Sequence, residues 1–205
     1  MAIKVLTVGP LLENCIIYSK NEKCIIFDPG DEAHKIISYI EENNLKPQFI
    51  LNTHGHYDHI GAVKSLQDKY NIPFYLHRDD HYLLDASVVA AFLGITNIEM
   101  PKEVREIKEG EVFTLEDDEF RAIHTPGHSK GSMCFYNEKE GILISGDTLF
   151  YLSIGRTDLP GGDYNSLITS VKNKLFILPD STKVYPGHER PTTIGFEKEL
   201  NPFFH

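Results

Sequence analysis

The densest group of chemically active side chains is residues 53–59, which read Thr-His-Gly-His-Tyr-Asp-His. Three imidazoles and one carboxylate fall within six residues, directly after a predicted strand. In an extended loop, His54 and His56 point to the same side and can bind one ion together. Asp58 and His59 come where the chain turns into a helix, so they face a neighbouring ion position. A solvated, histidine-rich turn is the alternative, and the density of ligand-type residues favours a metal site.

Three further ligand-type residues each follow a predicted strand and a glycine. His128 lies in a Pro-Gly turn, Asp147 follows Ser-Gly at the end of an apolar run, and His188 follows Pro-Gly. Such turns hold a side chain at the mouth of a sheet. Taken singly, each of the three fits a structural turn. Together with the first loop, the repeated order of strand, glycine and ligand predicts a metal centre.

The candidate ligands divide into two sets that share one carboxylate. Asp147 can offer both of its oxygens, so it is the natural bridge between two cations, and both positions leave room for a shared water. One set contains His54, His56, His128 and Asp147, and the other contains Asp58, His59, His188 and Asp147. Nitrogen and oxygen ligands without thiolate suit two divalent ions, zinc above all, with iron or manganese as alternatives.

Hydrophobic periodicity predicts an α/β protein in which each half begins with strands and continues with helix and strand. Strands are expected over 3–8, 14–19, 24–28, 49–52, 74–77, 112–115, 120–125, 132–136, 142–145 and 183–185, and helices over 31–43, 60–70, 79–93 and 164–175. No linker or low-complexity segment separates the halves. One compact domain over residues 1–205 is therefore predicted.

The composition limits the kinds of partner. The 205 residues include 20 Lys and Arg against 30 Asp and Glu, a formal net charge of −10, which disfavours nucleic acid and anionic membranes as partners. Cys15, Cys24 and Cys134 match no metal motif, which indicates buried thiols in a reducing, cytoplasmic setting. The sequence shows no signal-peptide pattern and no apolar stretch long enough to span a bilayer. It indicates no oligomeric state.

The 53–59 loop, His128, Asp147 and His188 resemble the metal signature of the metallo-β-lactamase superfamily. The resemblance runs from the first strand to the end of the chain. It implies a four-layer αβ/βα sandwich, the metallo-β-lactamase fold, with the metals at one edge. Asp28 in Ile-Phe-Asp-Pro-Gly matches the strand-end acid of this family, which braces the histidine loop.

A narrower resemblance is to the glyoxalase II-like hydrolases. It rests on Gly-Asp-Thr-Leu-Phe at 146–150, on Ser-Ile-Gly-Arg-Thr-Asp-Leu-Pro-Gly-Gly-Asp at 153–163, and on Pro-Gly-His at 186–188 leading to Leu-Asn-Pro-Phe at 200–203. That branch hydrolyses S-2-hydroxyacylglutathione thioesters. The larger enzymes carry a C-terminal glutathione-binding helical domain, which is not expected here, so the chain resembles their short, single-domain relatives.

The implied activity is attack of a metal-bridging hydroxide on a thioester carbonyl, with Asp58 both ligating and accepting the proton of the water. A thiolate leaves readily, since a free thiol has a pKa of about 8.5, so no strong general acid is required. A persulfide dioxygenase with a single iron, a lactonase or another ester hydrolase of the same fold are the alternatives. A zinc β-lactamase is less expected, because those enzymes place a cysteine where Asp147 stands or lack a bridging acid. A non-catalytic, metal-stabilised binding protein would need closed coordination.

Three residues near the site segments are weaker candidates for substrate contacts. Arg156 and Lys130 can pair with a substrate carboxylate. Arg156 can equally brace its own loop by bonding to Asp158, and Lys130 fits a solvated charge. Tyr57 either lines the mouth of the site or packs. The segment 79–100 either caps the cleft or forms a core helix, because its apolar side chains have no other evident destination.

Overall fold

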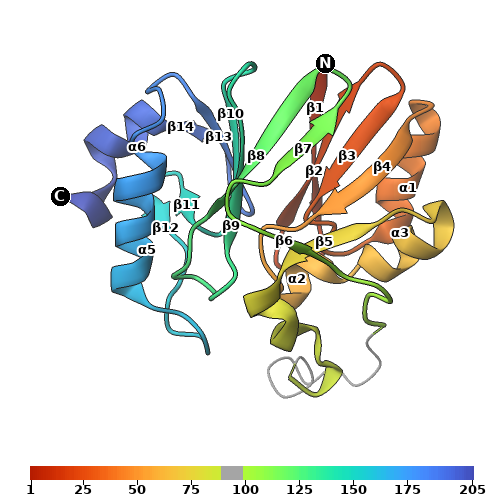
Figure 1. The fold of residues 1–205 in the computed structure, drawn as a ribbon, viewed down its shortest axis with the longest axis horizontal. Coiled ribbons are helices and arrows are strands. Elements are labelled where there is room, and N and C mark those ends of the chain that lie inside the picture. Colours follow the sequence, from red (N-terminus) through yellow and green to blue (C-terminus); the bar gives the residue numbers. More distant parts are fainter. Residues whose placement is uncertain (89–98) are drawn as a thin grey trace. The chain divides into compact units, whose positions relative to one another are not determined.

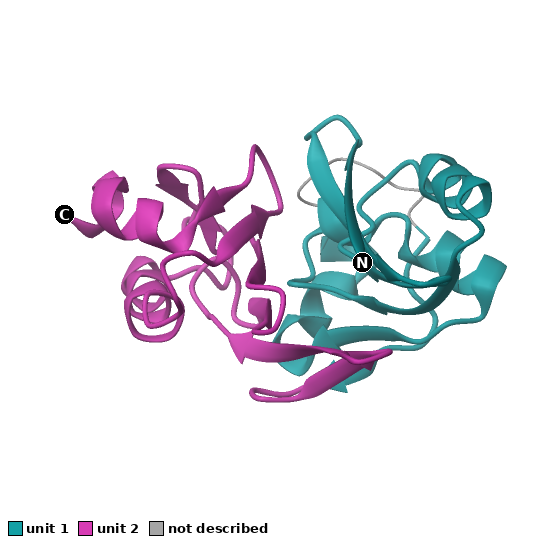
Figure 2. Ribbon diagram, turned by 90° about the horizontal axis from the view of Figure 1, so that it is seen from above, with its two compact units in different colours: residues 1–106 teal, residues 107–205 magenta. Residues whose placement is uncertain are grey.

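The computed structural model of this chain describes residues 1–88 and 99–205 (Figure 1). The chain divides into two compact units, Met1–Glu106 and Ile107–His205, which Figure 2 colours separately. Each unit contains one six-stranded mixed sheet. None of the helices in the described part of the chain combines the length and the hydrophobicity that a membrane span requires. A single domain over 1–205 stays a prediction.

The sheet of the first unit has the strand order β1-β2-β3-β4-β5-β6. Its strands are β1 (Ala2–Val8), β2 (Glu13–Lys20), β3 (Lys23–Phe27), β4 (Lys46–Leu51), β5 (Phe74–His77) and β6 (Arg105–Ile107). The first three pair antiparallel, whereas β3, β4 and β5 run parallel. Parallel neighbours need crossover connections. These contain the helices α1 (Ala33–Glu42), α2 (Tyr57–Ile60) and α3 (Val63–Tyr70).

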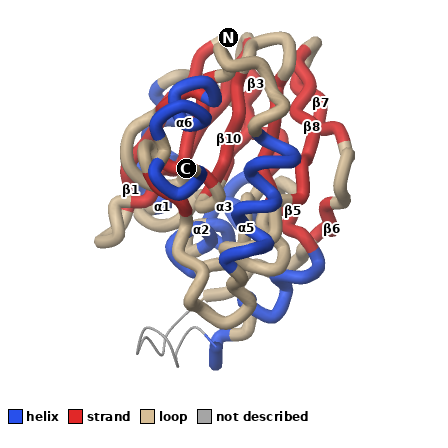
Figure 3. The backbone as a smooth tube through the Cα atoms, turned by 90° about the vertical axis from the view of Figure 1, so that its left-hand side faces the viewer, coloured by secondary structure: helices blue, strands red, loops and turns tan. Residues whose placement is uncertain are grey.

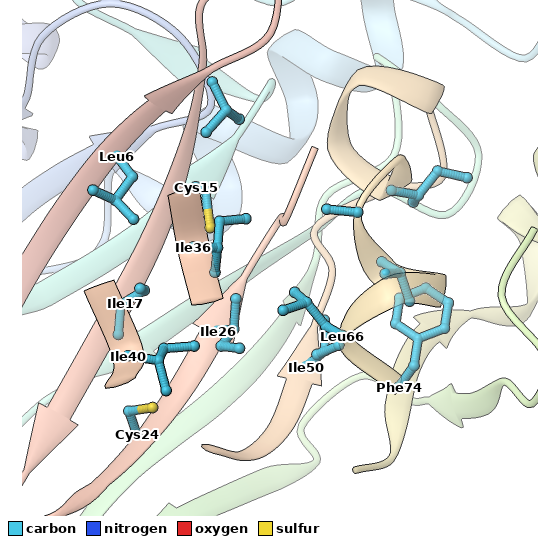
Figure 4. Close-up of a cluster of buried hydrophobic side chains, with 14 of the residues drawn as sticks. Leu6, Cys15, Ile17, Cys24, Ile26, Ile36, Ile40, Ile50, Leu66 and Phe74 are labelled. Carbon is cyan, nitrogen blue, oxygen red and sulfur yellow. The ribbon is translucent and has the colours of Figure 1, made fainter. Parts of the chain in front are cut away.

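Helices α1 and α3 pack on the first sheet because each carries an apolar stripe. Ile36 and Ile40 of α1 and Leu66 of α3 are fully buried. They belong to one core cluster with Ile26 of β3 and Ile50 of β4 (Figure 4). Full burial of such a side chain contributes about 1.5–3 kcal/mol. This core fixes the positions at which β3, β4 and β5 end.

The sheet of the second unit has the order β14-β13-β10-β9-β8-β7. Its strands are β7 (Val112–Leu115), β8 (Asp118–His124), β9 (Met133–Asn137), β10 (Ile142–Gly146), β13 (Lys183–Pro186) and β14 (Thr192–Thr193). A small separate hairpin is formed by β11 (Leu149–Phe150) and β12 (Ser153–Ile154). Strands β7 to β10 pair antiparallel in sequence, and β13 runs parallel to β10.

Helices cover the second sheet on the side shown in Figure 3. They are α5 (Tyr164–Ser170), its π-helical continuation η2 (Val171–Leu175) and α6 (Ile194–Leu200), followed by the short helix η3 (Pro202–Phe204). Leu167 of α5, Val171 of η2 and Ile194 of α6 share a buried cluster with Leu143 of β10 and Val184 of β13. The C-terminal helix is therefore part of the core of this unit.

The three cysteines are buried free thiols, as predicted. Burial raises the pKa of Cys24 to about 12. Burial also raises the pKa of Cys15, and the nearby Glu13 and Asp28 carboxylates raise it further. Both thiols therefore remain protonated at neutral pH, which fits a structural role.

The predicted helix over 60–70 is present as α3, which ends at Tyr70 as expected but begins three residues later, at Val63. α2 ends at Ile60 and α3 begins at Val63. Between them the backbone N–H of Ala62 donates to the carbonyl of Pro29 at 3.0 Å. A Cβ added at Gly61 would lie 2.3 Å from the carbonyl oxygen of Gly30. Tertiary contact with the segment after β3 thus interrupts the helix.

The helix predicted over 79–93 is in part a 3₁₀ helix, η1 (Arg78–Leu84), which begins after His77. Residues 89–98 lie outside the described residues, so the end of this predicted helix and the middle of the suggested cap over 79–100 are not described. The elements β6, β11, β12, β14, α6 and η3 were not predicted. Most have two or three residues, too few for a periodic pattern. Helix α6 has only seven, with a glycine as its second residue.

Candidate metal centre

Parallel strands bring several polar residues to one edge of the first sheet. Asp28 directly follows β3, the 53–59 loop follows β4, and Asp80 comes after β5. Because β3, β4 and β5 run in the same direction, their carboxyl ends meet at the same edge. The predicted histidine loop therefore lies between two carboxylates from neighbouring strands.

The imidazoles of this loop are close together. The ring centroids of His54 and His59 lie 4.0 Å apart, and those of His54 and His56 lie 4.8 Å apart. His54 and His59 are buried, whereas His56 and Asp58 are partly exposed. As expected, the chain becomes helical within the loop, at Tyr57. The Nε2 atom of His59 lies 3.8 Å from Oδ2 of Asp58.

Asp28 fixes the orientation of the loop. Its Oδ1 accepts a hydrogen bond from the backbone N–H of Thr53, and its Oδ2 accepts one from the Thr53 hydroxyl, both at 2.6 Å. The same Oδ2 lies 3.1 Å from Nδ1 of His59. A carboxylate at Nδ1 favours the tautomer that leaves Nε2 available as a ligand. These contacts agree with the bracing role expected for Asp28.

Three buried polar residues around the loop were not identified from the sequence. Oδ2 of Asp80 accepts from the backbone N–H of Gly55 at 3.1 Å. The amide of Asn52 donates to the carbonyl of His59 at 2.7 Å. Oε1 of Glu13 lies 3.9 Å from Nδ1 of His59. Asp80 and Asn52 follow or end strands, which is the signal that could have found them, whereas Glu13 carries no such signal.

The second unit gathers its three candidate ligands in the same way. β8 and β10 both pair antiparallel with β9, so they point in one direction, and β13 is parallel to β10. His128, Asp147 and His188 follow the carboxyl ends of β8, β10 and β13. The N–H of Gly187 donates to the carbonyl of Gly146 at 2.9 Å, which fixes two of these strand ends together.

Asp147 faces both imidazoles that are candidate ligands in the second unit. Its Oδ2 lies 3.5 Å from Nε2 of His128 and 3.7 Å from Nε2 of His188. The same oxygen thus faces both rings, and the bridging of two cations by this carboxylate stays a prediction. One carboxylate oxygen that lies between two imidazoles can also bind to two adjacent cations.

Backbone groups orient His128. Its Nδ1 lies 2.8 Å from the carbonyl oxygen of Arg156, so the ring donates there and keeps Nε2 toward Asp147. A Cβ added at Gly155 would lie 1.8 Å from the carbonyl oxygen of Asp147 and 3.1 Å from Nδ1 of His128. The close approach of these segments therefore requires glycine at 155.

The spacing of these donors fits a divalent cation. Two ligands of a tetrahedral zinc ion with bonds of about 2.0–2.1 Å lie roughly 3.3 Å apart. The nitrogen–oxygen separations between Asp58 and His59, His128 and Asp147, and His188 and Asp147 are 3.8, 3.5 and 3.7 Å. These exceed the usual hydrogen-bond distance of about 2.7–3.2 Å and approach the ligand spacing. Each unit thus presents donors of the right chemistry and separation.

The structure gives each of the three weaker candidates for substrate contacts a different environment. The Arg156 guanidinium pairs with both oxygens of Asp158 at 2.8 Å. This pairing lowers the pKa of Asp158 to about 2. Lys130 is exposed, which fits a solvated charge. Tyr57 packs against the first core cluster, and partial burial, with the nearby Asp31 carboxylate, raises its pKa.

Comparison with known proteins identifies the family. A sequence profile of the metallo-beta-lactamase superfamily matches residues 8–188. The probable metallo-hydrolase YqgX of Bacillus subtilis is 41% identical over 199 residues, covering 96% of this chain and 94% of its own. The hydroxyacylglutathione hydrolase GloC of Haemophilus influenzae is 37% identical over 207 residues, covering 99% of this chain and 98% of its own.

Two solved structures are also similar over almost the whole chain. A crystal structure of the BLEG-1 B3 metallo-beta-lactamase shows 40% identity and a TM-score of 0.90, covering 99% of both chains. A crystal structure of TTHA1623 in a di-iron-bound form shows 40% identity and a TM-score of 0.88, covering 98% of this chain and 99% of that one. The predicted α/β fold class is confirmed. With its clusters of metal-ligating side chains, the chain belongs to the metallo-β-lactamase superfamily of metal-dependent hydrolases.

Proposed function

We propose that the protein hydrolyses thioesters, with S-2-hydroxyacylglutathione as its substrate class. The observation that carries the proposal is the position of Asp147. One oxygen of this carboxylate lies 3.5 and 3.7 Å from the Nε2 atoms of His128 and His188. A carboxylate shared between two sets of ligands can hold two cations side by side, as a two-metal hydrolytic centre requires.

The proposed ligand sets are those expected from the sequence. His54, His56, His128 and Asp147 hold one cation, and Asp58, His59, His188 and Asp147 hold the other. Zinc is the proposed metal, with iron as the main alternative because TTHA1623 has a di-iron-bound form. When bound, such cations lower the pKa of a shared water toward neutrality and polarise a substrate carbonyl oxygen.

Asp58 is the proposed proton acceptor. Its side chain is 23% exposed, so water reaches it, and its Oδ2 lies 3.8 Å from Nε2 of His59. A carboxylate in this position can hold the proton released from water while the carbonyl carbon is attacked. The thiolate then leaves without a strong general acid, because its conjugate thiol is far more acidic than an alcohol.

The thioester assignment is supported by GloC, a hydroxyacylglutathione hydrolase that is 37% identical over 99% of this chain. A second candidate activity is β-lactam hydrolysis, because BLEG-1 is described as a B3 metallo-beta-lactamase at 40% identity. Asp147 favours the thioester, since a bridging acid is not expected in a β-lactamase.

We also propose that the chain forms one domain, works in the cytoplasm and acts on a small molecule. The net charge of −10 disfavours nucleic acid and anionic membranes as partners.

The deciding experiment separates metal dependence from substrate choice. The protein is stripped with a chelator, reloaded with zinc, iron or manganese, and assayed on S-lactoylglutathione, a simple ester, a lactone and a chromogenic β-lactam. We expect stripping to abolish turnover without unfolding the chain, and zinc to restore it. We expect kcat/KM for the thioester to exceed that for the other substrates by at least about tenfold.

Each other outcome has a defined meaning for the proposal. Faster turnover of the β-lactam would replace the thioester assignment with the second candidate. Oxygen consumption with glutathione persulfide by the iron-loaded protein would indicate a dioxygenase. Full turnover by the stripped protein would overturn the metal-dependent mechanism itself.

A further inference from the structure

The β11–β12 hairpin lies beside all three candidate ligands of the second unit. It begins two residues after Asp147, and the ring of Phe150 packs edge-on against His188 with centroids 6.2 Å apart. Two residues after the hairpin ends, the carbonyl of Arg156 accepts from Nδ1 of His128 at 2.8 Å. A displacement of this hairpin would therefore move the surroundings of every candidate ligand in the unit.

The hairpin has little stability of its own. Its two strands contain two residues each and share two register pairs. An isolated hairpin is marginal in water even when it is longer. Its turn contains Leu152 in the left-handed region at φ 53°, which a non-glycine residue adopts at a cost. Something outside the hairpin must hold this turn.

A buried carboxylate from the C-terminal helix holds it. Glu197 of α6 is 0% exposed, and its Oε2 accepts from the backbone N–H of Leu152 at 2.9 Å. The Asn201 amide donates to the same oxygen at 2.8 Å and to the carbonyl of Ser153 at 3.0 Å. The Thr192 hydroxyl donates to the other oxygen, Oε1, at 2.6 Å.

Aromatic stacking adds a second attachment at the same turn. The Tyr151 ring stacks on Phe196 of α6 with centroids 5.1 Å apart and planes inclined by 18°. The Arg190 guanidinium carbon lies 3.6 Å from the Tyr151 ring centroid. Helix α6 therefore contacts the hairpin at two places, through the partly exposed ring of Phe196 and through the buried carboxylate of Glu197.

We propose that Glu197 is a positioning residue of the metal centre. Through its hydrogen bond to Leu152, and through Asn201 at Ser153, it sets the position of the hairpin, and the hairpin sets the orientation of His128, Asp147 and His188. The effect on turnover rests on the proposed function. The effect on the His128 ring does not, because the His128–Arg156 hydrogen bond exists whatever the substrate is.

Two substitutions at this position separate its hydrogen-bonding role from its charge. Glu197→Ala removes the acceptor for Leu152 and Asn201. In Glu197→Gln, the amide oxygen can still accept from both, while the amide nitrogen donates to the Thr192 hydroxyl, which can turn to accept. We therefore expect the alanine variant to release the turn and the glutamine variant to hold it.

The readouts are turnover and the proton on Nδ1 of His128, observed by ¹H–¹⁵N NMR of the zinc-loaded protein. In Glu197→Ala we expect about 10- to 100-fold lower kcat with little change in KM, and faster exchange of the His128 proton with water. In Glu197→Gln we expect both to stay within about threefold of wild type. The proposal is overturned if folded Glu197→Ala keeps wild-type kcat and proton exchange.

A matched control tests whether any buried carboxylate of this unit would do the same. Asp118 is also 0% exposed and pairs with Lys139 at 2.9 Å, but it begins β8, at the opposite end from the turn that carries His128. We expect Asp118→Ala to lower the melting temperature and leave the His128 proton unchanged. An equal change in both variants would overturn the proposal.

A second variant keeps the test decisive if Glu197→Ala does not fold. Asn201→Ala removes the hold on the Ser153 carbonyl but leaves the Glu197–Leu152 bond. We expect the same direction of change, with a smaller amplitude, in kcat and in exchange of the His128 proton. Wild-type values for both would overturn the proposal. Failure of every thioester assay, with the His128 proton changed as expected, would overturn only the proposed function.

Discussion

The two groups of candidate ligands are held in different ways. In the first unit, His54, His56, Asp58 and His59 lie in one loop, and carboxylate side chains orient that loop: Asp28 at Thr53 and His59, and Asp80 at Gly55. In the second unit, the three ligands come from three strand ends and are contacted directly by backbone groups, such as the Arg156 carbonyl at His128, while the buried Glu197 carboxylate acts only indirectly, through the β11–β12 hairpin. A compact ligand loop needs polar side chains behind it, whereas dispersed ligands take their positions from the sheet.

This difference predicts where substitutions will act. In the first unit, replacing one supporting carboxylate should disturb several ligands at once through specific hydrogen bonds. In the second unit, replacing an exposed side chain near the ligands should change little, because the backbone carries the support. Three substitutions test the comparison, and they run from direct loss of a ligand to the loss of an exposed ion pair.

The largest effect is expected from losing a ligand. His56→Ala removes one imidazole from the partly exposed side of the loop. The fold should therefore persist, while one proposed cation site loses one of its ligands. We expect kcat/KM on the best substrate to fall by at least about 100-fold and bound zinc to decrease. Steady-state kinetics and metal analysis measure this.

The matched control is His34→Ala, which removes an exposed histidine from α1 of the same unit. It should leave both quantities unchanged. Wild-type activity in His56→Ala would show that His56 is not a ligand needed for turnover. The role assigned to the histidine loop in the comparison would then be wrong.

A smaller but sharper effect is expected from Asp28→Asn. The Thr53 N–H needs an acceptor at Oδ1, so the new amide nitrogen takes the place of Oδ2 and faces Nδ1 of His59. The ring must then accept at Nδ1 and carry its proton on Nε2, the atom needed for the metal. We expect metal affinity to fall about 10- to 100-fold with the fold retained.

Chelator competition measures the affinity of Asp28→Asn, and ¹⁵N chemical shifts report the His59 tautomer. Asp31→Asn is the control, because Asp31 is exposed and lies three residues along the same connection. An unchanged tautomer in Asp28→Asn would show that other groups orient His59, and the carboxylate support assigned to the first unit would then be wrong.

Much of the site was predictable because its residues follow strand ends. Runs such as 142–145 are mostly apolar and contain β-branched residues, so they indicate buried strands. A ligand-type residue that follows such a run and a glycine can therefore be recognised from the sequence. Asp28 was recognised because it stands in a strand-end motif of the superfamily. The positions of β3, β4, β10 and β13 then followed to within a few residues.

The supporting contacts were not predictable because they connect residues that are distant in sequence. Asp80 meets Gly55 across 25 positions, and Glu197 meets Leu152 across 45. The two-residue strands β11 and β12 have no periodic signal. The break between α2 and α3 depends on the Pro29 carbonyl, which only the folded chain brings to Ala62. Local pattern finds ligands, and tertiary packing decides what braces them.

The smallest effect is expected from Arg156→Ala, and it is the sharpest test of backbone support in the second unit. The guanidinium is occupied by Asp158, while the Arg156 carbonyl accepts from His128 and survives the substitution. We expect kcat and KM to stay within about threefold of wild type.

The pKa of Asp158, about 2 in the pair, should rise toward its ordinary value in Arg156→Ala. A carboxyl with a lowered folded pKa stabilises the fold above its unfolded pKa of about 3.9 and loses this contribution as the pH falls through about 2. The stability difference between variant and wild type should therefore be present at pH 6 and fade below pH 4, as denaturant titrations at each pH would measure. A large rise in KM for an anionic thioester would instead assign Arg156 to the substrate. A fall in metal affinity of about 10- to 100-fold, as expected for Asp28→Asn, would show that an exposed side chain also supports the second ligand group directly.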